Sequence, residues 1–191
     1  CLNIMPLFHI SGLIGSLLCS LAAGGKSYCC PKFSEDNFYL WMKDANPTWY
    51  MAAPTMQQAI LSKAEENKDI IKTNFLRFIR SASSFLPIQV QTQLEEKFKT
   101  PVLVSYGMTE TALHISNNPL PPGNRKPGSV GPASGPEVAI MDESGNLLSA
   151  NNSGEIVVRG DNVIVAYENN PEENRKSFTN GWFGTGDQGY L

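Results

Sequence analysis

The sequence predicts an α/β protein, in which a mainly parallel sheet is layered with helices and is followed by a small β-rich, distorted barrel-like subdomain. In the first half, short β-branched or aromatic runs alternate with helix-like segments, as is typical of parallel sheets. From about Pro119, proline and glycine become dense and the expected strands become short. We place the boundary within residues 117–127, which gives subdomains over residues 1–118 and 119–191.

The elements of the first half follow from hydrophobic periodicity and from cap residues. Ser34 can cap a helix because Glu35 and Asp36 follow it, and the helix dipole favours negative charge in the first turn. Pro54 suits the first turn of another helix. In chain order we expect a helix over 12–21, a strand over 27–30, a helix over 34–45, a strand over 49–53, a helix from Pro54, a strand over 75–80, a helix over 87–98 and a strand over 102–106.

The second half is expected to consist of short strands over residues 137–141, 155–159 and 163–166. Residues 142–146, Asp-Glu-Ser-Gly-Asn, predict a turn between two antiparallel strands.

Composition and charge limit the classes of function. The formal net charge of −3 argues against nucleic acid as the main partner, because phosphate binding draws on clustered lysine and arginine. The apolar stretch over residues 13–23 is shorter than the roughly 20 residues of a membrane-spanning helix, so we expect a buried helix and no transmembrane segment. No charged segment precedes this stretch, which argues against a secretory signal.

The four cysteines, at positions 1, 19, 29 and 30, lack the spacing of a zinc site. We expect reduced, partly buried thiols in a cytosolic or organellar protein, with a disulfide or metal role as the alternative. The chain begins at Cys1 within an apolar run and ends abruptly at Leu191, so we expect a segment of a longer protein.

The most specific motif is Ser-Tyr-Gly-Met-Thr-Glu at residues 105–110, directly after an apolar strand. Ligands collect at the carboxyl ends of strands in open α/β sheets. There Tyr106 could stack on a base and Gly107 lets the backbone approach a ligand. Thr109 could donate to a phosphate, and the Glu110 carboxylate could hold Mg²⁺. A strand end with a capping threonine is the simpler alternative.

Three further clusters are weaker when taken alone. Asp187, among the glycines of residues 181–187, could accept both hydroxyls of a ribose, since a carboxylate has two acceptor oxygens. The Lys-Pro-Gly-Ser-Val-Gly turn at 126–131 lacks the spacing of the phosphate loop of nucleoside triphosphatases. His9, in Pro-Leu-Phe-His, is among apolar residues. Each cluster has a simpler alternative. Asp187 could belong to a plain turn, the 126–131 segment could be a structural loop, and His9 could be a satisfied core residue or a helix-entry residue.

The clusters, with Arg-Ser-Ala-Ser-Ser at residues 80–84, occur in the order found in one enzyme class. Together they resemble the adenylate-forming superfamily, which includes acyl-CoA synthetases and coumarate–CoA ligases. Thr-Trp-Tyr at 48–50, Arg-Phe-Ile-Arg-Ser at 77–81, Asn-Pro-Leu-Pro-Pro-Gly at 118–123 and Asp-Gln-Gly-Tyr at 187–190 are similar to the oxalate–CoA ligase branch of fungi and plants.

The resemblance implies an ATP-dependent acid–thiol ligase that forms an acyl-adenylate and then transfers the acyl group to CoA. It implies ATP and Mg²⁺, with CoA as co-substrate and a small carboxylic acid as partner. Thr109, Glu110 and His9 would act in catalysis. Ser83, Ser84, Tyr106, Gly107, Thr109 and Asp187 would bind the nucleotide. Glu110 would hold the metal, Tyr106 would stack on adenine, Asp187 would bind ribose, and His9 would lie near the acyl group.

Departures from the oxalate branch leave the acid open. That branch has a second histidine where this chain has Ser11, and another where it has Leu113; His114 follows one step later. On a helix one residue turns a side chain by roughly 100°, so His114 need not reach the same pocket. Phe85 stands where the family has a small residue or proline. Oxalate is the leading expectation, with a medium-chain or aromatic acid as competitor.

The resemblance implies a Ser/Thr/Gly-rich phosphate loop before this segment and a C-terminal domain with the catalytic lysine after it. We therefore expect the isolated chain not to form an adenylate. The resemblance implies an intracellular protein of the peroxisome or the cytoplasm. A non-catalytic nucleotide-binding relative and an unrelated α/β domain are the alternatives. Retention of Thr109, Glu110 and Asp187 argues against the first, and the joint order of the motifs argues against the second.

Overall fold

The polypeptide passes three times between two units in the computed structural model, which describes residues 1–191. The first unit contains residues 1–107 and 116–132, and the second contains residues 108–115 and 133–191. The subdomain division at residue 118 stays a prediction, since the two units interleave along the chain.

The first unit is built on a six-stranded sheet in the order β2-β1-β3-β4-β5-β6. All neighbouring strands are parallel except β5 and β6, which are antiparallel, so the predicted mainly parallel sheet is confirmed. The strands are β1 Leu2–Asn3, β2 Tyr28–Cys29, β3 Trp49–Ala52, β4 Phe78–Ser81, β5 Val102–Tyr106 and β6 Ser116–Asn117.

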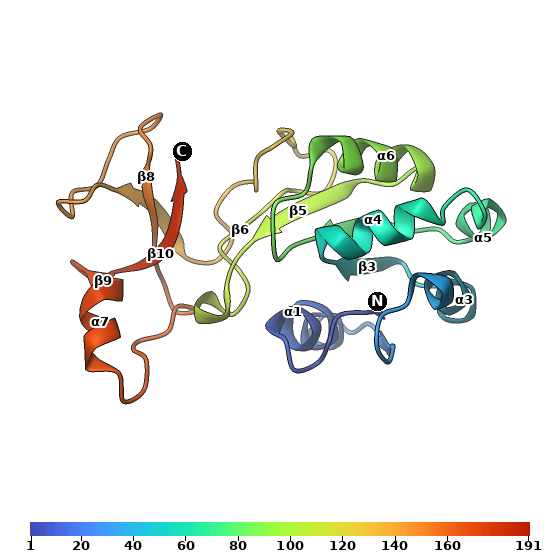
Figure 1. Cartoon of the computed structure of the whole chain (residues 1–191), viewed down its shortest axis with the longest axis horizontal. Coiled ribbons are helices and arrows are strands. Elements are labelled where there is room, and N and C mark those ends of the chain that lie inside the picture. Colours follow the sequence, from blue (N-terminus) through green and yellow to red (C-terminus); the bar gives the residue numbers. More distant parts are fainter. The chain divides into compact units, whose positions relative to one another are not determined.

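Helices connect the parallel strands, as Figure 1 shows for α4 and α6 beside β3 and β5. Ser34 caps one helix, its Oγ accepting from the Asn37 amide at 3.4 Å, and Pro54 begins the next, as the sequence predicts. The helices are α1 Ile10–Gly12, the π-helix η1 Leu13–Leu18, α2 Cys19–Ala22, α3 Glu35–Ala45, α4 Pro54–Ser62, α5 Lys68–Thr73 and α6 Ile88–Phe98.

The core of this unit joins the strands to α3, α4 and α6. Phe38 of α3 lies edge-on to Tyr50 of β3, with ring centroids 5.0 Å apart, and both residues are fully buried. Ile79 of β4 and Leu94 of α6 belong to the same buried cluster. Because side chains alternate along a strand, Arg80 points to the face of the sheet opposite Ile79, and it is buried there.

The apolar segment over residues 13–23 is helical, but the expectation that it is buried is wrong. Leu13, Leu18 and Leu21 are 42%, 48% and 53% exposed. The helix instead buries its small residues, since a Cβ on Gly12 would lie 2.2 Å from the Pro6 carbonyl oxygen. Across the chain, no helix combines the length and apolar character needed to cross a bilayer.

The four cysteines are free thiols. Cys1 and Cys30 are half-buried, whereas Cys19 and Cys29 are exposed, so the expected partial burial holds for only two of them. Burial and the neighbouring Cys29 raise the pKa of the Cys30 thiol to about 12, so this group is protonated and unreactive near neutral pH.

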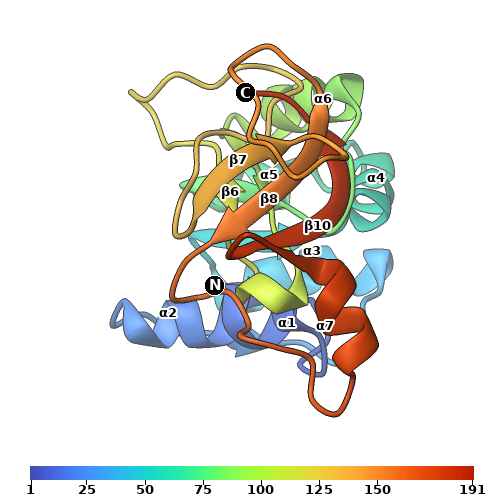
Figure 2. The same cartoon turned by 90° about the vertical axis from the view of Figure 1, so that its left-hand side faces the viewer.

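The second unit contains a four-stranded antiparallel sheet in the order β7-β8-β10-β9, a half-barrel that confirms the predicted β-rich part (Figure 2). Met141, Val157 and Trp182 form a buried cluster in it. Its elements are the 3₁₀ helix η2 Thr109–Thr111, β7 Glu137–Met141, β8 Gly154–Arg159, α7 Pro171–Ser177, β9 Phe178–Thr179 and β10 Trp182–Gly189.

One expected strand is absent, and several elements come where none was expected. Residues 163–166 form bends and turns: the Val163 amide donates to the Gly160 carbonyl, and the Ile164 amide donates to the Glu110 carbonyl at 2.8 Å. The amides of Val163 and Ile164 therefore form hydrogen bonds within a turn and to the Glu110 loop, and not to a neighbouring strand. The elements that the sequence does not predict are β1, α5, η2, β6, α7, β9 and β10.

Candidate functional site

The loop after β4 carries two of the predicted nucleotide-binding residues. Ser83 and Ser84 are exposed, and Ser83 has a φ of 81°, in the left-handed region. This conformation costs an L-residue about 1 to 2 kcal/mol, and such strain is often found at functional sites. The Ser83 Oγ lies 3.4 Å from the Oγ of the buried Ser11.

His9 lies at the start of α1, with its side chain exposed. Its Nδ1 accepts a hydrogen bond from the Ser11 amide at 3.2 Å, so the neutral ring carries its proton on Nε2. Ser11 therefore contacts both His9 and Ser83, and the first unit brings these two predicted residues together. The Nε2 proton is available for donation to a negatively charged group.

Tyr106 ends β5, and Gly107 follows it. Because β4 and β5 are parallel neighbours with Ser81 opposite Val104, the Ser83 loop and Tyr106 lie at the same edge of the sheet. Just inside this edge, the Arg80 Nε donates to the Ser105 Oγ at 3.0 Å, and its Nη2 donates to the Asn117 Oδ1. Burial lowers the pKa of the Arg80 guanidinium, which remains charged and ties β4 to β5 and β6.

The Lys-Pro-Gly-Ser-Val-Gly segment has a structural role in the first unit. Gly131 has a φ of 87°, and a Cβ on it would lie 2.3 Å from the carbonyl carbon and oxygen of Asn117. The Gly131 amide donates to the Ser129 Oγ at 3.1 Å, and the Ser129 carbonyl accepts from the Asn118 Nδ2 at 2.8 Å. The glycine therefore lets this loop pack directly on the backbone at the end of β6.

Thr109 and Glu110 belong to the second unit, in η2. Thr109 is exposed, whereas Glu110 is half-buried. The Tyr167 hydroxyl donates to the Glu110 Oε1 at 3.0 Å. Burial, and then this hydrogen bond, raise the pKa of Tyr167 to about 12, so the phenol keeps its proton near neutral pH. The carboxylate is thereby held by one oxygen, and Oε2 is left for another partner.

Asp187 is exposed and lies on a β-bulge of β10. Gly184 pairs with Val157 and Gln188 pairs with Glu155, so four steps along β10 correspond to two along β8. The Glu155 Oε1 accepts from the Gly186 amide at 3.0 Å and fixes the bulge. Bulges re-aim side chains and are frequent beside active sites, and this one explains the glycines around Asp187.

The helical argument about His114 is wrong. Helix η2 ends at Thr111, and the next two residues, Ala112 and Leu113, have left-handed φ angles of 49° and 78°. Leu113 is buried, with 4% of its surface exposed, and His114 is half-buried. The backbone turn, and not helical rotation, therefore sets the direction of the His114 side chain.

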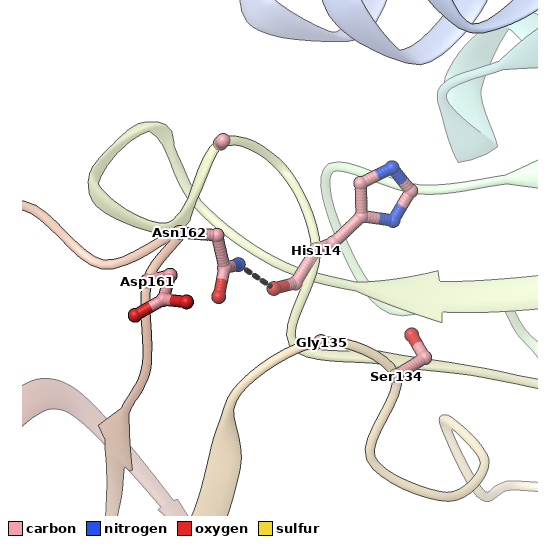
Figure 3. Close-up of a pocket in the computed structure, with 6 residues that line it drawn as sticks. His114, Ser134, Gly135, Asp161 and Asn162 are labelled. Atoms are coloured by element: carbon pink, nitrogen blue, oxygen red, sulfur yellow. Dashed lines mark hydrogen bonds between the residues drawn. The ribbon is translucent and has the colours of Figure 1, made fainter.

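A pocket of about 390 Å³ lies in the second unit. The Asn162 Nδ2 joins two walls of this pocket by donating to the carbonyl of His114 at 2.8 Å, as Figure 3 shows, and it also donates to the carbonyl of Thr111 at 2.7 Å. In this view the imidazole of His114 points away from Asp161. None of the predicted site residues lines this pocket. Its lining residues are Ala112, His114, Ser134, Gly135, Asp161 and Asn162.

The Glu110 carboxylate suits a magnesium ion, although no set of protein ligands surrounds it. No group of three His, Cys, Asp or Glu side chains in the chain could hold a metal ion. Mg²⁺, however, is usually bound by one or two carboxylates together with substrate phosphates and water. A single oriented carboxylate with one oxygen left over meets that requirement.

Sequence reasoning missed three residues that shape this region: Tyr167, Asn174 and Glu155. The Asn174 side chain forms hydrogen bonds with the backbone of Tyr167, and the Glu155 carboxylate accepts a hydrogen bond from the bulge that contains Asp187. Tyr167 and Glu110 are 57 residues apart, so no local pattern could have paired them. The only signal in the sequence was the residue type, since a tyrosine hydroxyl needs a partner wherever the ring is buried.

Comparisons with known proteins agree with the motifs. Residues 1–168 match the family model described as AMP-binding enzyme. The chain is 46% identical over 191 residues to an oxalate–CoA ligase of Arabidopsis thaliana, a match that covers 98% of this chain and 37% of the relative. The chain therefore spans little more than a third of that relative's length.

Solved structures are similar over the whole chain. ATP-bound MatB from Rhodopseudomonas palustris matches with a TM-score of 0.89 at 33% identity, over 100% of this chain and 37% of that one. O-succinylbenzoate coenzyme A synthetase from Bacillus subtilis, in complex with ATP and magnesium ion, matches with a TM-score of 0.83 at 34% identity, over 100% and 38%. Fold, motif order and family model agree, and this chain belongs to the family of AMP-binding enzymes.

Proposed function

We propose that the protein containing this chain is an ATP-dependent acyl-CoA synthetase, with oxalate as its leading substrate. The observation that carries the proposal is the half-buried Glu110 carboxylate, fixed at one oxygen by Tyr167, in the motif that follows the buried strand β5. A simple strand end with a capping threonine requires no carboxylate held in this way. The similarity to an oxalate–CoA ligase supports the choice of acid.

The reaction would proceed in two displacements. A carboxylate oxygen of the acid attacks the α-phosphorus of ATP, which forms the acyl-adenylate and releases pyrophosphate. The CoA thiol, on losing its proton, then attacks the acyl carbon, which forms the thioester and releases AMP. Both steps depend on alignment and on neutralising the charge that develops on phosphate, and bound Mg²⁺ would supply part of that neutralisation.

Each predicted residue has a role that its position supports. Glu110 would hold Mg²⁺ through Oε2 or through water, and the exposed Thr109 hydroxyl would contact the α-phosphate or the acyl carboxylate. Asp187, exposed on the β10 bulge, would accept the ribose hydroxyls. A larger set would bind the rest of the substrates: Tyr106 stacked on adenine, Gly107, Ser83 and Ser84 along the nucleotide, and His9 donating from Nε2 to the acyl group.

The choice of acid depends on Ser11 and Leu113, which replace histidines of the oxalate branch. Ser11 supplies a buried hydroxyl beside Ser83, whereas Leu113 supplies only a buried apolar side chain. A small diacid needs donors for its second carboxylate, and the hydroxyl of Ser11 together with the exposed His9 meets part of that need. A medium-chain or aromatic acid is the second candidate, favoured by Leu113.

A panel of acids tests the assignment. Thioester formation by the full-length protein, with ATP, Mg²⁺ and CoA, would be followed by mass spectrometry for oxalate, malonate, an aromatic acid and a medium-chain fatty acid. We expect the highest kcat/KM with oxalate. A product with the aromatic or fatty acid and none with oxalate would overturn the oxalate assignment, and nucleotide binding without any thioester would favour a non-catalytic relative.

A further inference from the structure

The loop over residues 160–167 holds Glu110 at two places. Its backbone reaches the glutamate through the Ile164 amide, which donates to the Glu110 carbonyl oxygen at 2.8 Å. A side chain of the same loop also contacts this glutamate, since the Tyr167 hydroxyl donates to the Glu110 Oε1 at 3.0 Å. The main chain and the carboxylate of Glu110 are therefore both oriented by one loop.

Tyr167 is itself fixed within the second unit. The Asn174 Oδ1 accepts from the Tyr167 amide at 2.7 Å, and the Asn174 Nδ2 donates to the Tyr167 carbonyl at 2.9 Å. The Tyr167 ring also lies against Phe183, with centroids 6.4 Å apart, and Phe183 is 2% exposed. Helix α7 and strand β10 thus determine where the phenol hydroxyl is placed.

We propose that Tyr167 is a positioning residue for the metal-binding carboxylate of Glu110. This inference rests on the proposed function, in which Glu110 binds Mg²⁺. A hydrogen bond to Oε1 would leave Oε2 available to a cation and would stop the carboxylate from rotating between alternative arrangements. Hydrogen bonds to metal-ligating carboxylates contribute strongly to metal sites, and their loss typically costs about 10- to 100-fold in metal affinity or activity.

The competing explanation is that the hydroxyl only ties two loops together. A purely structural tie would affect all ligand binding by the second unit to the same degree, with or without a divalent cation. A positioning role instead affects only the part of ATP affinity that depends on Mg²⁺. The ratio of ATP affinity with Mg²⁺ to ATP affinity with EDTA separates the two explanations.

The experiment measures that ratio by isothermal titration calorimetry on the full-length protein and its Tyr167→Phe variant. We expect the ratio to fall about 10-fold in the variant, with the affinity for ATP in EDTA unchanged. Both affinities come from one preparation, so a loss of folded protein lowers the number of sites without altering the ratio. An unchanged ratio would overturn the inference.

Control variants separate the possible failures. Tyr28→Phe removes a hydroxyl from an exposed position on β2 and should leave the ratio at its wild-type value. Asn174→Ala, which releases the backbone of Tyr167 but keeps the hydroxyl, should lower the ratio in the same direction as Tyr167→Phe. If it does not, the placement of Tyr167 by α7 is excluded.

The proposed function is tested separately by Glu110→Gln. If this variant leaves the ratio unchanged, the magnesium role that the proposed function gives to Glu110 fails. If Glu110→Gln lowers the ratio and Tyr167→Phe does not, only the positioning role fails. In the Glu110→Gln background, adding Tyr167→Phe should have no further effect, as is required of two groups that act through one interaction.

Discussion

Replacing Gly131 with alanine should lower the free energy of unfolding of the first unit by about 2 to 5 kcal/mol. About 1 to 2 kcal/mol of this arises because Gly131 has a φ of 87°, which an L-residue adopts only under strain. The rest arises because the new Cβ would lie 2.3 Å from backbone atoms of Asn117, which cannot move without disturbing the pairing of β6.

Gly128→Ala is the matched control. Gly128 has a φ of 80°, but its nearest neighbour to an added Cβ is the Ile88 Cδ1 at 3.7 Å, an ordinary contact. This variant should therefore lose only about 1 to 2 kcal/mol. Urea denaturation followed by the fluorescence of Trp41 and Trp49, both in the first unit, measures the two variants. Equal losses would mean that the loop relaxes and that close packing on β6 is not the reason for this glycine.

Replacing Glu110 with glutamine should lower the rate of adenylate formation by about 100-fold or more, since loss of a single group that stabilises transition-state charge commonly costs that much. Glutamine has the same size and still accepts a hydrogen bond from Tyr167, so the local fold should persist. What it loses is the negative charge that attracts Mg²⁺. Pyrophosphate release by the full-length protein under saturating substrate measures the effect.

The control for this prediction is Glu143→Gln, which neutralises an exposed carboxylate in the turn between β7 and β8. Its rate should equal that of the wild type. A Glu110→Gln variant that retains most of its activity, at every Mg²⁺ concentration tested, would show that this carboxylate is not a metal ligand.

Elements with clear local signals could be predicted closely. Strands β5 and β7 occupy residues 102–106 and 137–141, as the apolar β-branched runs between turn residues predict. The expected strand over 75–80 instead forms β4 at Phe78–Ser81, and Phe75 is 84% exposed. The apolar pattern identified the element, but pairing with β3 and β5 determines where it begins and ends.

The missed elements are those in which tertiary contacts outweigh local preference. Strand β10, Trp-Phe-Gly-Thr-Gly-Asp-Gln-Gly, is rich in glycine, yet pairing with β8 and β9 makes it a strand. Helix α7 had usable signals, since Asn170 caps it, Pro171 starts it, and acidic residues precede basic ones. It was overlooked because it buries no side chain and so has no apolar stripe.

In the candidate site, too, features with a local sequence signal could be predicted, and features set by tertiary contacts could not. The motifs identified the loops after β4 and β5 and the Asp187 bulge, because short glycine- and hydroxyl-rich segments at strand ends have a recognisable composition. The contacts that hold Glu110, Tyr167 and Asn174 could not be read from the sequence, because they join distant segments. The left-handed turn at Ala112 and Leu113 was also hidden, since neither residue type favours it.

The chemistry of adenylate formation is tested most directly by following oxygen from the acid. The full-length protein would be given oxalate labelled with ¹⁸O in its carboxylates, together with ATP, Mg²⁺ and CoA, and the products would be examined by mass spectrometry. Attack of the carboxylate on the α-phosphorus predicts AMP that carries one ¹⁸O atom. Release of ADP together with ¹⁸O-labelled inorganic phosphate would instead show attack on the γ-phosphorus, and would contradict assignment to an adenylate-forming ligase.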